Sequence, residues 1–357
     1  MSRVEPFRLT SEHRLALLMH GHLLQGYGKM GLGLLRYSQS PIVAVIERDH
    51  VGQDLEQLTG ISRSVPIVAS VQEAMDLGAN TLVIGVATAG GVLPNDYWEE
   101  MRRGLAGGMS LVNGLHNPLR EHPDLVPLLH SGATIWDVRQ EPKGLTNGAG
   151  LARNLPAKRV LTVGTDMAVG KMTASLEMDR EARARGLRSK FLASGQIGIC
   201  IAGEGVALDA VRVDFASGAI EQMVMRYGAD HDILHVEGQG SLLHPASTAW
   251  LPLIRGACPT HLILVHRAGQ ESIFRTDWVQ IPPLREVIAL YESICSCGGA
   301  MPTAKVAGIA LNCAKLSSED AKTAVQKVEA ETGLPTTDVV RFGARVLLDA
   351  VLGGFAS

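Results

Sequence analysis

Aromatic residues are scarce in this sequence, at 4% of 357 residues, whereas glycine occurs 39 times. This is the composition of a globular α/β protein rather than a disordered or fibrous one. Neither charge dominates, since 33 Lys and Arg stand against 36 Asp and Glu, and no basic block occurs. A surface that binds nucleic acid needs clustered Lys and Arg. The composition therefore argues against a nucleic-acid partner and leaves small anionic ligands open.

Cysteine is also sparse, with five residues scattered through the chain. An odd, scattered set does not form a disulfide framework, and the pair Cys295 and Cys297 has no second pair to complete a zinc site. We predict no metal site. No apolar run reaches membrane-spanning length, and the charged N-terminal segment lacks the apolar stretch of a secretory signal. We therefore expect a cytoplasmic protein without a membrane partner.

Short apolar runs alternate with helical stretches in two parts of the chain. The predicted strands are Leu15–Met19, Ile42–Ile46, Thr81–Val86, Ser110–Val112, Thr134–Val138, Arg159–Val163, Ser189–Leu192, Ile233–Val236, His261–Val265 and Val306–Leu311. The predicted helices are Met30–Tyr37, Val71–Leu77, Asp96–Ala106, Lys171–Arg185, Ser318–Thr332 and Gly343–Leu352. Strand–helix alternation with apolar strands predicts mainly parallel sheets covered on both faces. Because residues 140–157 are rich in Gly, Pro and Asn, we predict two α/β domains, 1–150 and 151–357, with a ligand cleft between them.

The segment G-T-D-M-A-V-G-K-M-T, Gly164–Thr173, lies between a predicted strand and a predicted helix. A glycine-rich turn there directs backbone N–H groups inward, and the helix N-terminus and Lys171 add positive charge. These features predict a phosphate-binding loop, with Gly164, Thr165, Asp166, Gly170, Lys171, Met172 and Thr173 as cofactor-binding residues. Met172 stands where a hydroxyl would bind Mg²⁺, with Thr173 one residue late. The second domain is thus P-loop NTPase-like.

Polar residues follow three further strands of the second domain, at the edge where ligands collect in open α/β sheets. Lys190 lies in the strand Ser189–Leu192, the turn Ser194-Gly195-Gln196 follows that strand, and Glu237 ends another. Glu237 fits a metal ligand, a base or a partner for a substrate amine. Asn312 ends a third strand, and its amide suits recognition of a base edge or of another polar group.

The first domain carries a weaker pattern. Gly26-x-Gly28-x-x-Gly31 followed by Glu47 has the outline of a dinucleotide fingerprint, but it does not follow its strand directly. We interpret it as an ordinary turn of a Rossmann-like domain. His116, in a loop after a strand, suits proton transfer or loop packing equally. Arg139 suits a clamp on a substrate carboxylate, or an ion pair with Asp137 across the domain seam.

Several of these segments carry family resemblances. The Gly164–Lys171 loop, Lys190–Gly195, V-E-G-x-G from Val236 and Gly308–Asn312 resemble dethiobiotin synthetase, which lacks a counterpart of residues 1–150. From Gly31–Tyr37 through Asp137–Arg139 to S-G-Q-I-G-I and V-E-G-Q-G-S-L-L-H-P, the chain resembles a family of D-glutamate N-acetyltransferases, once a domain of unknown function.

The second resemblance implies transfer of an acetyl group from acetyl-CoA to D-glutamate or a related small amino acid. It implies Glu237 or His116 as base, with Lys190 as a further catalytic candidate. Backbone N–H groups at 194–198 would stabilise the oxyanion, and Arg139 or Lys190 would bind substrate carboxylates, so Arg139, Ser194, Gly195 and Gln196 become substrate-binding candidates. The alternatives are an ATP- and Mg²⁺-dependent ligase or kinase, and an NAD-binding or ligand-binding regulator. We also expect a homo-oligomer.

Overall fold

A computed structural model describes residues 8–88 and 91–353; the first residues of the N-terminal segment, for which no signal is predicted, lie outside this range. Its contacts divide the chain into two compact units. Unit 1 comprises residues 1–140 and 196–207, and unit 2 comprises 141–195 and 208–357. A single boundary at residue 150 does not describe this division, because residues 196–207 leave the second half of the chain and pack with the first.

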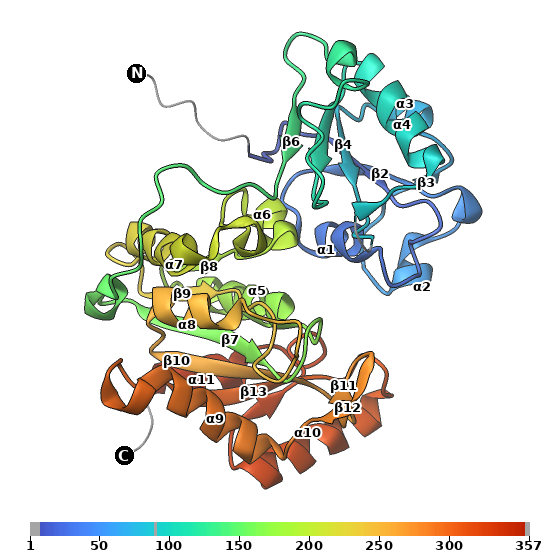
Figure 1. The fold of residues 1–357 in the computed structure, drawn as a ribbon. Helices are drawn as coiled ribbons and strands as arrows, with labels where there is room; N and C mark the ends of the chain where they lie inside the picture. The colour runs from blue at the N-terminus through green and yellow to red at the C-terminus, as the bar shows by residue number, and fades with distance from the viewer. Residues whose placement is uncertain (1–7, 89–90, 354–357) are drawn as a thin grey trace. The chain divides into compact units, whose positions relative to one another are not determined.

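Unit 1 is a parallel six-stranded sheet in the order β3-β2-β1-β4-β5-β6 (Figure 1). Its strands are β1 (Leu15–Leu18), β2 (Ile42–Ile46), β3 (Ile67–Val68), β4 (Thr81–Ile84), β5 (Ser110–Asn113) and β6 (Ile135–Asp137). Its helices are α1 (Lys29–Tyr37), α2 (Leu55–Thr59), α3 (Val71–Asp76), α4 (Asn95–Ala106) and α6 (Gln196–Ala202). α3 and α4 pack with one face of the sheet in a single apolar cluster, and α6 packs beside α1.

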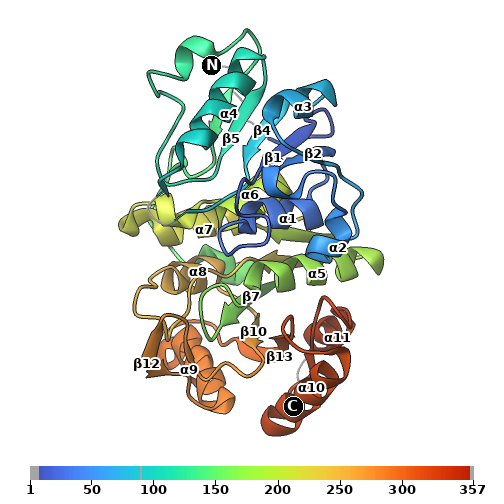
Figure 2. The ribbon, with the colours of Figure 1, turned by 90° about the vertical axis from the view of Figure 1, so that its right-hand side faces the viewer.

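Unit 2 has a second parallel sheet, in the order β14-β13-β10-β7-β9-β8 (Figure 2). Its strands are β7 (Lys158–Gly164), β8 (Ser189–Leu192), β9 (Ile233–Val236), β10 (His261–Arg267), β13 (Lys305–Asn312) and β14 (Thr336–Thr337), with a hairpin of β11 (Ser272–Ile273) and β12 (Thr276–Gln280). Its helices are α5 (Lys171–Ala184), α7 (Val213–Tyr227), α8 (Trp250–Ala257), α9 (Leu284–Ser296), α10 (Ser318–Thr332) and α11 (Arg345–Gly353).

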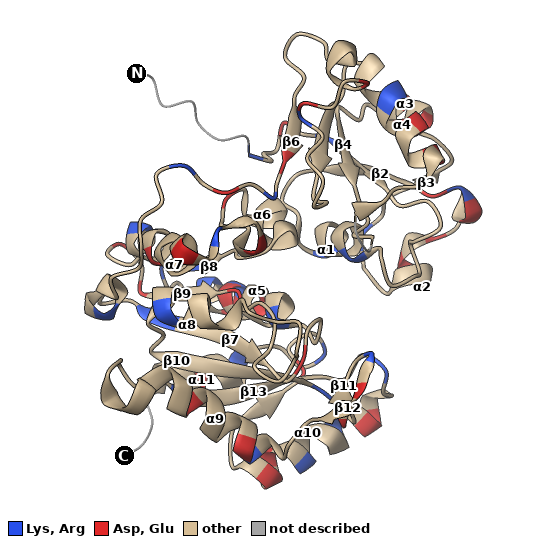
Figure 3. Ribbon diagram, viewed as in Figure 1, with Lys and Arg blue, Asp and Glu red and all other residues tan. Residues whose placement is uncertain are grey.

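Right-handed crossovers put the helices of unit 2 on both faces of its sheet. α5 and α11 share an apolar cluster with Val160, Ile233 and Ile263 of the sheet. The strand order places α7, α8, α9 and α10 on the other face. Figure 3 shows that charged residues concentrate on helices and loops, with acidic and basic residues interspersed along α10. The predicted α/β class with two mainly parallel sheets is confirmed.

The predicted strands and helices are all present, and three strands, β2, β8 and β9, have the predicted bounds. All five cysteines are free, and four of them, Cys200, Cys258, Cys295 and Cys313, are buried. Burial raises the pKa of Cys295 to about 12 and that of Cys313 to about 11, which fits unreactive structural thiols. No helix among the described residues combines the length and apolar character needed to span a membrane.

His235 is the least satisfied polar group in the sheet of unit 2. It lies within β9, fully buried, and neither ring nitrogen has a hydrogen-bond partner among the residues described. Burial, together with the smaller effect of the Arg183 charge, lowers the pKa of His235 to about 3. Between about pH 6.5 and pH 3, His235 is protonated in the unfolded chain but neutral in the folded chain. Folding stability therefore decreases as the pH falls through this window.

We expect His235→Leu to stabilise the protein at neutral pH by about 1–3 kcal/mol, because a buried polar group without partners is removed. The gain should grow as the pH falls below about 6.5. Urea unfolding at several pH values measures both effects, with the exposed His130→Leu as control. A destabilised His235→Leu protein would show that the imidazole has a packing role that leucine cannot take.

Candidate active site around the phosphate-binding loop

The loop Gly164–Thr173 joins β7 to α5 at the carboxyl edge of the sheet of unit 2, where open α/β sheets bind ligands. Gly170 has a φ of 117°, a conformation that side-chain-bearing residues rarely adopt. It precedes α5 without a side-chain cap, so the first N–H groups of the helix have no intrahelical acceptor. Together with the positive end of the helix dipole, these groups form an anion-binding surface.

Lys171 supplies the full positive charge of the loop. Its side chain is buried, and Nζ donates a hydrogen bond to the Asp166 carbonyl at 2.8 Å. Burial lowers the pKa of Lys171 to about 8, although the charges of Asp166 and Glu237 favour its protonated form. A nearby anion such as a phosphate would stabilise the charged form of this buried ammonium.

The side chains of Thr165 and Asp166 anchor the loop. The Thr165 hydroxyl lies 2.9 Å from His266 Nδ1, at the end of β10. The Asp166 carboxylate accepts hydrogen bonds from Gln270 Nε2 at 2.6 Å and from the Phe274 backbone at 2.8 Å. These two predicted cofactor-binding residues therefore hold the loop against β10 and the hairpin, and Lys171 and the backbone amides remain to face a ligand.

Glu237 lies directly after β9 and is buried, with its carboxylate held in place by three donors. The Ser194 and Gly195 amides donate to Oε2 at 2.9 and 3.1 Å, and Gln239 Nε2 donates to Oε1 at 3.2 Å. Burial raises the pKa of Glu237 to about 7, while the hydrogen bonds and the charge of Lys171 act in the opposite direction. A carboxylate with such a pKa exchanges protons near neutral pH, as a general base must.

This arrangement corrects the expectation for the turn Ser194-Gly195-Gln196. Its first two amides are bonded to Glu237, so they position the carboxylate and do not point at an oxyanion. The Ser194 hydroxyl likewise donates to the Glu237 carbonyl, at 2.7 Å. Gln196 begins α6, which belongs to unit 1.

Lys190 is not brought to the loop. Its Nζ lies 4.3 Å from the centre of the Tyr227 ring, at the C-terminal end of α7. α7 leads into β9, so this end of the helix lies at the amino edge of the sheet, opposite the phosphate-binding loop. The structure therefore offers Lys190 a cation–π contact in place of the catalytic role expected from the sequence.

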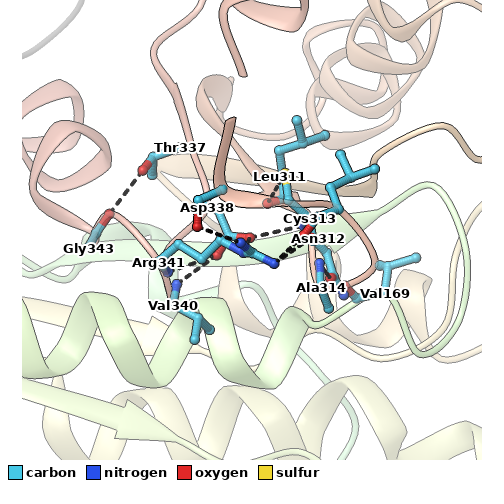
Figure 4. Close-up of polar contacts among 12 residues, drawn as sticks. Val169, Leu311, Asn312, Cys313, Ala314, Thr337, Asp338, Val340, Arg341 and Gly343 are labelled. Carbon is cyan, nitrogen blue, oxygen red and sulfur yellow. Dashed lines mark hydrogen bonds and ion pairs between the residues drawn. The ribbon is translucent and has the colours of Figure 1, made fainter. Parts of the chain in front are cut away.

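Asn312 ends β13 and ties the following loop to the phosphate-binding loop. Its Nδ2 donates to the Val169 carbonyl at 2.8 Å, and its Oδ1 accepts from the Ala314 amide at 3.1 Å. Figure 4 shows Asn312 close to Val169 and Ala314, with Asp338 and Arg341 to its left. One N–H and one lone pair of the amide remain after these bonds. This pattern complements adenine, whose N7 accepts a hydrogen bond and whose N6 donates one.

The first turn of α5 offers no hydroxyl directly after Lys171. Met172 and Thr173 are both half-buried there. The next hydroxyl of the helix, Ser175, is buried and lies 3.1 Å from the Thr162 hydroxyl of β7. Among residues 8–88 and 91–353, no group of three or more His, Cys, Asp or Glu side chains is arranged to hold a metal ion.

The N-terminal candidates gather at the carboxyl edge of unit 1. Arg139 Nε donates to the Gly114 carbonyl at 2.7 Å. Burial and the charge of Arg139 lower the pKa of His116, which places the two side chains near each other. Gln196, at the start of α6, lies beside Gly114. The Asp137 carboxylate accepts three hydrogen bonds, from the Asn113 side chain and from the backbone amides of residues 119 and 120.

The dinucleotide pattern belongs to an ordinary turn, as expected. Although the strand order of unit 1 matches dinucleotide-binding folds, the Glu47 carboxylate is fully buried and accepts hydrogen bonds from the amides of His22 and Asp49. A Cβ on Gly28 would overlap the His22 carbonyl. This glycine therefore allows close packing of the turn against the His22 carbonyl.

Sequence reasoning missed the residues that support the loop from β10, namely His266, Arg267 and Gln270. Arg267 Nη2 donates to the Ala168 carbonyl at 2.9 Å. The sequence pattern that identified Glu237 and Asn312, polar residues at the end of an apolar strand, also occurs at the end of β10 and could have identified these residues.

The fold and the loop define a two-domain α/β protein that joins a Rossmann-like unit to a P-loop unit. The P-loop domain described for the DUF1611 domain of unknown function matches residues 146–348, and its Rossmann-like N-terminal domain matches residues 48–141. The chain belongs to this family. A crystal structure of a DUF1611 family protein from Anabaena variabilis superposes with a TM-score of 0.94 at 60% identity, covering 96% of this chain and 100% of that one.

Two curated relatives carry a functional name. A D-glutamate N-acetyltransferase from Tritonibacter scottomollicae is 39% identical over 79% of this chain and 84% of its own length. A D-glutamate N-acetyltransferase from a Pseudoalteromonas species is 35% identical over 77% of this chain and 82% of its own length.

Proposed function

We propose that this protein is an acetyl-CoA-dependent N-acetyltransferase that acts on D-glutamate or a related small amino acid. The names of the two relatives support the reaction, and the phosphate-binding loop supports a phosphate-bearing donor. The observation that carries the proposal is Glu237: a buried carboxylate with a pKa of about 7, held by two backbone amides in the same unit as the loop and close enough for its charge to act on Lys171.

In this reaction the amino-acid ammonium must lose a proton before its nitrogen can attack a thioester carbon. Glu237 takes that proton, because its pKa of about 7 keeps the carboxylate form available near neutral pH. A C–N bond then forms as the C–S bond breaks, and the second proton lost by the nitrogen passes to the departing sulfur, which leaves as the free thiol. Lys171 and the amides at the start of α5 hold the donor's phosphates, and Asn312 faces its base. Arg139, His116 and Gln196, all in unit 1, stay predicted candidates for binding the amino acid.

The alternatives have less support. A ligase or kinase that turns over Mg²⁺–ATP needs a hard oxygen ligand after the loop lysine, and Met172 supplies a thioether. Thr173 is about 100° further around the helix, so it does not simply replace that ligand. An NAD-binding regulator is disfavoured by the buried Glu47. A homo-oligomer stays a prediction, for which light scattering is the direct measurement.

We expect acetylation of D-glutamate, or of a close amino acid, to survive EDTA without loss of rate. Acyl transfer from a thioester needs no metal, and no ADP or phosphate should appear. Mass spectrometry of the N-acetyl product and an assay for released thiol measure the reaction, and a coupled ADP assay with Mg²⁺–ATP is the control. Substrate-dependent, Mg²⁺-dependent ADP release would overturn the proposal in favour of the ligase.

A further inference from the structure

A small cavity of about 160 Å³ lies beside the phosphate-binding loop of unit 2. Arg267 and Ala268, at the end of β10, form one wall, and the loop Asn312–Leu316, which follows β13, forms the other. Its lining carries two cations, Arg267 and Lys315, and no acidic residue. The charge of the cavity therefore favours an anion.

A larger cavity of about 840 Å³ shares Ala268 and Leu316 with it but has the opposite character. Its lining includes Glu271, Asp320 and Glu331 and only one lysine, Lys327, around an apolar floor. A phosphate group is repelled by such a lining. Of these two neighbouring cavities, only the small one suits the charged end of a ligand whose other phosphates lie on the loop.

Both walls of the small cavity are hydrogen-bonded to the phosphate-binding loop. Arg267 Nη2 reaches the Ala168 carbonyl at 2.9 Å, and Asn312 Nδ2 reaches the Val169 carbonyl at 2.8 Å. A ligand that enters the cavity therefore lies close to the phosphate-binding loop and its anion-binding amides. Arg267 uses one of its five N–H donors in the contact with the Ala168 carbonyl. Its other donors can bind an anion in the cavity.

The wall that carries Lys315 is held in a fixed conformation (Figure 4). Asp338 accepts a hydrogen bond from the Cys313 amide at 2.9 Å, and Arg341 Nη2 donates to the carbonyls of Cys313 and Leu316 at 3.2 and 2.6 Å. Lys315 itself is exposed on this loop. Because its neighbours are braced on both sides, little backbone ordering is needed when an anion binds there.

We propose that this cavity binds the 3′-phosphate of acyl-CoA, with Lys315 and Arg267 contacting the phosphate and Asn312, at the edge of the cavity, facing the adenine. This inference rests on the proposed function and deepens it. ATP and dephospho-CoA lack the 3′-phosphate, so the two cations distinguish CoA from the adenine nucleotides that other phosphate-binding loops hold. Lys315 is then a specificity-determining residue for the acyl donor.

Titration calorimetry with CoA and with dephospho-CoA tests the inference. We expect the wild-type protein to bind CoA about tenfold more tightly than dephospho-CoA, as one charge-assisted contact would give. Lys315→Ala should lose this preference by weakening CoA alone, with dephospho-CoA binding unchanged. Lys327→Ala, which removes the lysine of the larger cavity, is the matched control and should keep the preference.

Equal binding of CoA and dephospho-CoA by the wild-type protein would overturn the inference and leave the proposed function intact. Equal weakening of both ligands by Lys315→Ala would also overturn it, because the lysine would then not read the 3′-phosphate. If neither ligand binds while ATP does, the proposed function itself fails, and the inference fails with it.

Discussion

Glu237→Gln should lower kcat for N-acetylation by about 10²–10⁴-fold while the affinity for acetyl-CoA changes little, because glutamine keeps the shape of the side chain but cannot accept the substrate proton. The glutamine carbonyl can still accept the amide hydrogen bonds from Ser194 and Gly195 that hold Glu237. Steady-state rates and calorimetry with CoA separate the two quantities.

The pH profile gives a second measure of the same residue. Since burial raises the pKa of Glu237 to about 7, the carboxylate form is the active one, and the wild-type rate should rise as the pH increases through that value. Stability moves the other way. The folded chain keeps a proton that the unfolded chain loses between about pH 4.5 and 7, so folding stability decreases as the pH rises through this window. Glu237→Gln should remove both dependences.

Glu221 provides a matched control for this variant. It is also a buried carboxylate of unit 2 that accepts two backbone amides, from Ala149 at 3.0 Å and Leu151 at 2.7 Å. Its partners belong to the segment that leads into β7 and not to the loop. Glu221→Gln should therefore leave kcat and the pH profile of activity unchanged. A Glu237→Gln enzyme that matches the Glu221→Gln enzyme in rate and pH profile would remove Glu237 from the chemistry.

The sequence predicts most of the framework because its strong signals are local. β2, β8 and β9 have the predicted bounds because each is a short run bounded by turn residues. α9 was missed although Pro283 precedes it and Leu284, Val287, Tyr291 and Cys295 follow at helical spacing. α8 is harder to predict, because Pro252 in its first turn resembles a break.

The arrangement of the candidate site depends on contacts that sequence does not encode locally. Polar residues at the carboxyl ends of parallel strands meet at one edge of the sheet, and this rule predicts that Lys171, Glu237 and Asn312 lie at the same edge. It could not tell that the Ser194 and Gly195 amides point at Glu237, since this follows from the pairing of β8 with β9. It also misplaced Lys190, whose long side chain reaches the Tyr227 ring at the other edge.

Lys171→Met should weaken CoA binding by about a hundredfold or more, because the buried ammonium is the only positively charged side chain of the loop Gly164–Thr173. The stability of the protein without ligand should change little. Burial already opposes the charged form, as the pKa of about 8 shows, so an apolar side chain of similar length offsets the lost hydrogen bond to Asp166.

Proton uptake on CoA binding distinguishes the effect of the Lys171 charge from the effect of its side-chain shape. A bound phosphate stabilises the ammonium and raises its pKa above about 8, so CoA binding near that pH should take up protons. Calorimetry in buffers of different ionisation enthalpy measures this uptake, which Lys171→Met should abolish. Lys158→Met, at the other end of β7, is the matched control and should preserve both affinity and proton uptake. If Lys171→Met binds CoA as tightly as the wild-type protein, the loop is a structural turn and does not hold the phosphates of the donor.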